Sequence, residues 1–155
     1  MESELIKAIK QIFPSGPDGF EGLIAKLLTE LTGRQFILAK SGSQKGRDMS
    51  VRQINSNVIV VECKRYDIKS KLNSRELIGE IEEAVRDIPD LDLWVLVTSK
   101  NISSQLSEVL HQIAQKNSIE FFSISDGDGE PSSLEALCAS SSETVISFTK
   151  SDNTE

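Results

Sequence analysis

The chain has 155 residues, of which 38% are hydrophobic and 26% charged, and this composition is ordinary for one compact globular domain. No apolar run approaches the ~18 residues that a membrane-spanning helix needs, and the acidic first residues lack the basic start and apolar core of a signal peptide. The two cysteines, Cys63 and Cys138, lie in dissimilar contexts and are expected to be unpaired, which favours a reducing, cytoplasmic compartment.

The first part of the chain predicts two helices. Apolar residues recur at helical spacing over residues 4–13, and Pro14 ends that pattern. The second helix, over residues 18–31, carries the stronger pattern. It opens as a capping box does, with an aspartate followed three residues later by Glu21, and Gly33 stands where a C-cap glycine belongs.

Strands and further helices follow in alternation. The apolar patterns predict strands over 35–39, 48–54, 58–66, 91–98 and 119–124, with helices over 74–88 and 104–114 between the later ones. Residues 55–57 are typical of a tight turn, which would join the second and third strands into an antiparallel hairpin. The fourth strand is nearly all apolar and is therefore expected at the centre of the sheet.

The composition changes after Ser125, where serine and acidic residues become frequent. We expect loop or linker there, with a short strand over 145–148. The order of elements, α-α-β-β-β-α-β-α-β, predicts a mixed sheet with helices on both sides.

The net charge of −7 argues against a nucleic-acid partner, but the charge is unevenly distributed. Residues 34–75 hold ten basic and three acidic side chains, so that segment carries +7 and the remainder −14. A basic segment on an acidic body predicts a local site for a polyanion. The alternative is a solvated, lysine-rich surface.

The segment 58–66 is the most informative stretch of the sequence. A run of β-branched apolar residues ends at Glu62, and Lys64 follows two positions later. Because residues i and i+2 of a strand share a face, both charges are expected to point the same way. Burying either charge without a partner would be costly, so the pattern favours a strand end where a hard cation and a polar substrate dock.

Three acidic residues are expected to meet at this strand end. Asp48 opens the second strand of the hairpin, Glu62 closes the third, and Glu21 lies in the first turn of the main helix. Mg²⁺, or Mn²⁺ in its place, prefers such oxygen ligands and usually binds one or two carboxylates together with substrate phosphates. Lys64 is placed to orient the attacking water or to stabilise a pentavalent phosphate. Basic residues nearby are expected to contact the nucleic-acid backbone: Lys45, Arg47, Arg65, Lys69, Lys71 and Arg75.

Three segments carry a resemblance to a known family. Residues 46–48 (Gly-Arg-Asp) and 60–66 (Val-Val-Glu-Cys-Lys-Arg-Tyr) resemble the PD-(D/E)xK nuclease superfamily, most closely its Mrr-like restriction endonuclease branch. The helix start at 19–21 (Gly-Phe-Glu) looks like that branch too. By position, Asp48 and Glu62 match the metal-binding acids of the family, Lys64 the catalytic lysine and Glu21 the helix acid. No proline precedes Asp48, a departure that this branch often shows.

The resemblance implies an α/β fold with a restriction-endonuclease-like α-β-β-β-α-β core over about 18–124 and a mixed central sheet flanked by helices. It implies a nuclease-like domain over 1–125, followed by a Ser-rich acidic tail or linker over 126–155. The implied activity is Mg²⁺-dependent endonuclease cleavage of DNA, most of all double-stranded DNA. Such modules often form the N-terminal effector part of a restriction or anti-phage defence protein, so we expect a homo-oligomer or a larger multidomain protein, and no membrane.

Each assignment has a structural alternative. Glu21 also fits a capping box, Asp48 a turn, and the pair of Glu62 and Lys64 an ion pair on a surface strand. The glutamates at 76, 80, 82 and 83 are expected to form a solvated helix face, with Glu80 the one to check for a role behind the site. The alternative function is a catalytically silent nuclease fold that binds nucleic acid or mediates assembly.

Overall fold

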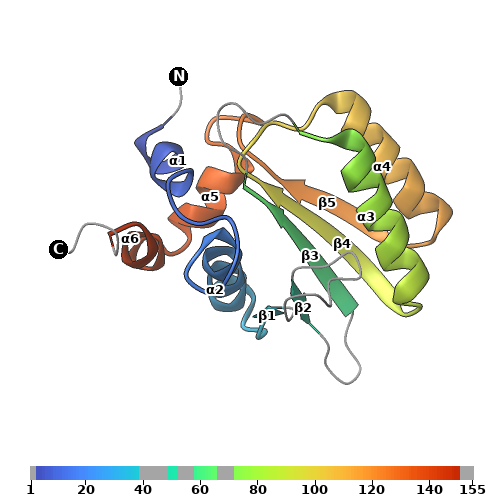
Figure 1. Ribbon diagram of the computed structural model, residues 1–155, viewed down its shortest axis with the longest axis horizontal. Helices are drawn as coiled ribbons and strands as arrows, with labels where there is room; N and C mark the ends of the chain where they lie inside the picture. The colour runs from blue at the N-terminus through green and yellow to red at the C-terminus, as the bar shows by residue number, and fades with distance from the viewer. Residues whose placement is uncertain (1–2, 39–48, 52–57, 66–71, 151–155) are drawn as a thin grey trace.

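The computed structural model describes residues 3–38, 49–51, 58–65 and 72–150 (Figure 1). Among these residues, no helix is both long and apolar enough to cross a bilayer. The elements, in chain order, are α1 (Glu4–Ile9), α2 (Phe20–Thr32), β1 (Ile37–Leu38), β2 (Met49–Val51), β3 (Val58–Lys64), α3 (Ser74–Asp87), β4 (Leu91–Thr98), α4 (Ser104–Lys116), β5 (Glu120–Ile124), α5 (Ser133–Ala139) and α6 (Ser142–Lys150).

The five strands form one mixed sheet in the order β1-β2-β3-β4-β5. The first three strands pair antiparallel, and β3, β4 and β5 pair parallel. The predicted mixed sheet and the predicted antiparallel pairing of the second and third strands are therefore confirmed. The expected turn at 55–57 lies outside the described residues. In the pairing of β2 with β3, Met49 lies opposite Val61, the residue that precedes Glu62.

The sheet separates two apolar cores because side chains alternate along each strand. On one face, Val61 and Cys63 pack with α1, α2, α5 and α6. On the other face, Val58 and Val60 pack with α3 and α4. Figure 1 shows these two sets of helices on opposite sides of the strands. By the same alternation, Glu62 belongs to the face that α3 covers.

Helix α2 begins one residue later than the sequence predicts, since its N-cap is Gly19 and not Asp18. No side chain caps it, and the capping box expected at its start is wrong. The chain turns so tightly before this helix that a Cβ on Gly19 would overlap the carbonyl oxygens of Phe13 and Ser15. The carboxylate of Glu21 instead accepts the backbone N–H of Gly16, at 3.3 Å. The C-cap prediction is confirmed, since Gly33 adopts the left-handed conformation.

The last described segment is helical. The expected strand over 145–148 is wrong, since these residues lie in α6, and the expectation of loop or linker fails for the residues of α5 and α6. Helix α5 opens with a capping box between Ser132 and Glu135. The buried side chains of both helices join the core under α2; they are Leu134, Leu137, Cys138 and Val145. The division of the chain into domains at residue 125 stays a prediction.

Candidate active site

The centre of the site is the carboxyl end of β3, where two charged side chains follow the apolar part of the strand. Lys64 Nζ lies 3.3 Å from Glu62 Oε1. The side chain of Glu62 is 6% exposed and that of Lys64 18%. The two charges on this strand face are thus paired and largely shielded from water. An ion pair on an exposed edge strand would be solvated instead.

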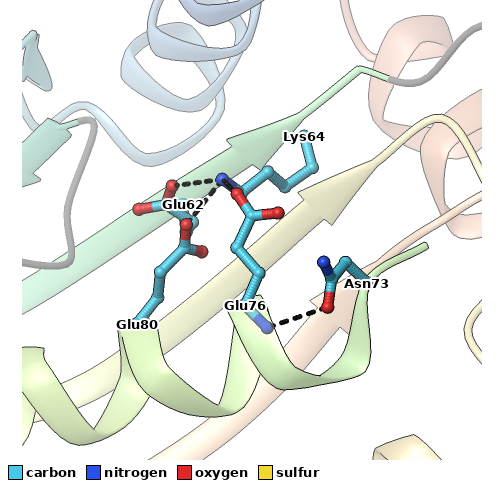
Figure 2. A network of polar contacts seen from close by, with 5 residues as sticks. All are labelled: Glu62, Lys64, Asn73, Glu76 and Glu80. Atoms are coloured by element: carbon cyan, nitrogen blue, oxygen red, sulfur yellow. Dashed lines mark hydrogen bonds and ion pairs between the residues drawn. The ribbon is translucent and has the colours of Figure 1, made fainter. Parts of the chain in front are cut away.

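Helix α3 supplies two more carboxylates to the same ammonium (Figure 2). Lys64 Nζ donates hydrogen bonds to Glu80 Oε1 at 2.6 Å and to Glu76 Oε1 at 2.9 Å. Residues four apart lie on the same side of a helix, so both glutamates reach the strand end together. The prediction of a solvated helix face is therefore wrong for Glu80, the residue singled out in the sequence for a role behind the site. Glu76 is exposed as predicted, but it also contacts Lys64.

The charge state of Lys64 follows from these contacts. Burial alone would lower the pKa of the ammonium. The hydrogen bonds to Glu80 and Glu76 and the charge of Glu62 outweigh burial, and the net result is a pKa raised well above its ordinary value. With these three carboxylates around it, Lys64 is an ammonium, which can donate hydrogen bonds and stabilise negative charge.

Glu21 lies on α2, not on the two elements β3 and α3 that carry this cluster. It belongs to a helix whose buried side chains pack on the opposite face of the sheet from the one that carries Glu62. Its carboxylate holds the loop before the helix through the N–H of Gly16. The described contacts give Glu21 a structural role, and its metal-binding role stays a prediction.

Among the basic residues expected to bind nucleic acid, two are described. Arg65 is partly buried, and its Nη1 donates to the carbonyl oxygen of Lys10 at 2.6 Å, which ties β3 to the end of α1. Arg75 is exposed on the first turn of α3. The remaining predicted site residues lie outside the described part of the chain: Lys45, Arg47, Asp48, Lys69 and Lys71.

The donor chemistry of the site fits a hard divalent cation. Glu62 offers carboxylate oxygens at the strand end, and such oxygens are what Mg²⁺ and Mn²⁺ prefer. Within the described ranges no group of three His, Cys, Asp or Glu residues is arranged around a metal position. One or two carboxylates with water and phosphate suffice for Mg²⁺. The described strand β2 begins at Met49, whose partner on β3 is Val61, the residue before Glu62.

Comparison with known proteins agrees with the fold. The model of the Mrr-type catalytic domain, described as restriction endonuclease, matches residues 15–126. The matched segment contains all five strands, helices α2 to α4 and both Glu62 and Lys64. No curated protein shows significant similarity to the chain.

Proposed function

Because the chain belongs to the Mrr-type restriction endonuclease family, we propose that it is a Mg²⁺-dependent endonuclease that hydrolyses phosphodiester bonds in DNA. The observation that carries this proposal is the pair of Glu62 and Lys64, 3.3 Å apart at the end of β3. A carboxylate can hold a metal ion at this strand end, and an ammonium beside it can stabilise charge on a phosphate, so the pair suits phosphodiester hydrolysis.

Lys64 would act on the charge that develops in the reaction. In hydrolysis a water oxygen forms a new bond to phosphorus, the bond to the leaving nucleotide oxygen breaks, and that oxygen takes up a proton. Lys64, held as an ammonium, donates hydrogen bonds to the attacking water or to the phosphate oxygens as their negative charge grows. Because an ammonium has no acceptor, another group must accept the proton of the water.

The metal would be held by Glu62 together with Asp48. When bound, Mg²⁺ or Mn²⁺ would lower the pKa of a coordinated water and neutralise charge on the phosphate. Glu62 is suited to this role because its side chain is almost fully buried, and its ion pair with Lys64 fixes it in place. Glu21 stays a third candidate ligand in this proposal, although its carboxylate also accepts the N–H of Gly16.

DNA would lie against basic residues around the strand end. Arg75 is exposed on α3, whereas Arg65 is engaged with the end of α1, so we give Arg75 the backbone contact. Lys45, Arg47, Lys69 and Lys71 complete the proposed set. We further propose that the chain is the N-terminal effector module of a restriction or anti-phage defence protein, and that it acts as a homo-oligomer or within a larger multidomain protein.

The test is cleavage of supercoiled plasmid DNA in Mg²⁺ and in EDTA. The unaltered chain is compared with Glu62→Ala, Lys64→Ala and the control Glu120→Ala, which removes an exposed glutamate from β5. We expect cleavage that requires Mg²⁺, that disappears in the first two variants and that persists in the control. Cleavage by Lys64→Ala at the unaltered rate would contradict the assignment.

Absence of cleavage by every variant would lead to a second assay. The chain would be fused to a dimerising segment and tested again, because a lone domain of this size offers little specificity. Cleavage after fusion would support a module that works only when clustered. Binding of DNA without cleavage in both forms would favour the silent nuclease fold.

A further inference from the structure

Lys64 is surrounded by as many carboxylates as it has N–H donors. An ammonium has three donors and no acceptor. Two of them form hydrogen bonds to Glu76 and Glu80, and Glu62 lies 3.3 Å from the same nitrogen. A phosphate oxygen or an attacking water that approaches the ammonium must therefore displace one carboxylate.

The three carboxylates differ in how readily they can be displaced. The side chain of Glu62 is 6% exposed, that of Glu80 19% and that of Glu76 46%. A buried carboxylate that loses its partner stays unsatisfied, whereas an exposed one is hydrated at once. Glu76 also has the longer of the two hydrogen bonds, 2.9 Å against 2.6 Å for Glu80. Exposure therefore singles out Glu76 among the three carboxylates, and bond length ranks it behind Glu80 among the two hydrogen-bonded ones.

Glu76 also has an alternative partner on its own helix. It is the third residue after the N-cap Asn73, whose side chain accepts the N–H of Glu76 at 3.1 Å. In a complete capping box, the glutamate at this position bonds the backbone N–H of the capping residue. Helix α5 has that complete form, with Glu135 Oε1 accepting the N–H of Ser132 at 3.3 Å. In α3 the same kind of glutamate reaches across to Lys64 instead, as Figure 2 shows.

We propose that Glu76 and Glu80 have different tasks at Lys64: Glu80 is a positioning residue that keeps hold of the ammonium, and Glu76 occupies the place of a DNA phosphate oxygen and leaves when DNA binds. The inference rests on the proposed function, since it assumes that Lys64 meets a phosphate. After release, the Glu76 carboxylate turns to the N–H of Asn73 or to water. The free chain thereby keeps its lysine masked until a polyanion competes for it.

The first experiment measures affinity for a short fluorescent DNA duplex, in EDTA and in Ca²⁺, so that no cleavage is needed. Glu76→Gln is compared with Glu82→Gln, an exposed glutamate of the same helix. Glu76→Gln should tighten binding about two- to fivefold, the range set by an exposed ion pair. The control reports the effect of a distant charge alone, which we expect to stay below roughly 1.5-fold. Equal gains in the two variants would overturn the proposal.

The second experiment asks whether that gain passes through Lys64. Both glutamine variants are remade with Lys64→Met, which keeps much of the apolar stem and removes the ammonium. In this background Glu76→Gln should gain no more than Glu82→Gln, because no masked ammonium is left to release. A gain at Glu76 that persists without Lys64 would show ordinary charge repulsion and would refute the exchange.

The third experiment separates the two glutamates by rate and affinity. At saturating DNA and Mg²⁺, Glu80→Gln should lower the single-turnover rate roughly tenfold or more, since a misplaced catalytic group has effects of that size. Its affinity should change no more than that of the control. Glu76→Gln should show the opposite split, with tighter binding and a clearly smaller loss of rate than Glu80→Gln. Loss of rate in Glu76→Gln with none in Glu80→Gln would reverse the assignment and refute it.

The outcomes also separate this inference from the proposed function. If the unaltered chain binds no DNA in either EDTA or Ca²⁺ and cleaves none, the proposed function fails and the inference fails with it. If it binds or cleaves DNA but the glutamine variants behave alike, the inference alone is wrong.

Discussion

Removal of the Lys64 ammonium should destabilise the fold by an amount that depends on how deeply its three carboxylate partners are buried. In Lys64→Met, three carboxylates lose their shared counter-ion. Loss of one partner from a fully buried ion pair costs about 3–5 kcal/mol. Here Lys64 is 18% exposed and Glu76 46% exposed, so solvent screening reduces the expected loss to about 2 kcal/mol. That loss is small enough, against a typical stability of about 5–15 kcal/mol, for the variant to remain folded.

The assay is urea unfolding followed by the fluorescence of Trp94, which is fully buried on β4 and is the only tryptophan of the chain. With a urea m-value of about 2 kcal/mol per molar, the midpoint should fall by about 1 M without a change in m. Adding Glu80→Gln to Lys64→Met should recover part of the loss, because it removes a stranded, largely buried charge. A midpoint for Lys64→Met that equals the unaltered one would refute the reasoning, as would a second loss in the double variant.

Three further predictions concern other parts of the chain. Hydrogen bonds from Ser141 and Thr144 lower the pKa of Glu30 below its ordinary value of 4.5. These hydrogen bonds therefore stabilise the fold above pH 4.5, and the stabilisation is lost as the pH falls through the lowered pKa. Melting temperatures of Glu30→Gln should lack this loss at acid pH. The carboxylate of Asp92 accepts the N–H of Val58 at 2.7 Å, so Asp92→Ala should lower the unfolding free energy by about 1 kcal/mol and speed amide exchange at the start of β3. Burial, and then the charge of Glu135, raises the pKa of Cys138 to about 12, so Ellman's reagent should label this thiol no faster than the protein opens.

The parts of the fold that the sequence predicted well are those where one physical pattern dominates. The run over 91–98 is apolar on both faces apart from Asp92 and Thr98, so it was expected inside the sheet, and β4 lies there. The pairing of Glu62 with Lys64 follows from the two-residue period of a strand alone. Both predictions depend only on the local geometry of a strand, which is the same whatever the tertiary fold.

The errors arose where a residue's partner is distant in sequence. Glu76 and Glu80 lie on the polar side of a helix with a strong amphipathic pattern, and nothing local distinguishes a solvated glutamate from one that meets a lysine. Helix α5 was missed because serine-rich composition outweighed a signal that was present. Ser132 and Glu135 form a capping-box pattern, and the buried residues Leu134, Leu137 and Cys138 follow helical spacing.

The position of α5 and α6 has a consequence for the order in which the molecule is completed during synthesis. The core under α3 and α4, which supports the end of β3, is made of residues up to 121. The core on the other face needs side chains as late as Val145. A chain emerging from the ribosome therefore has all the core residues of the face that carries Glu62 and Lys64 before it has those of the opposite face. Until the last two helices arrive, the inner side of α2 presents apolar surface that chaperones would recognise.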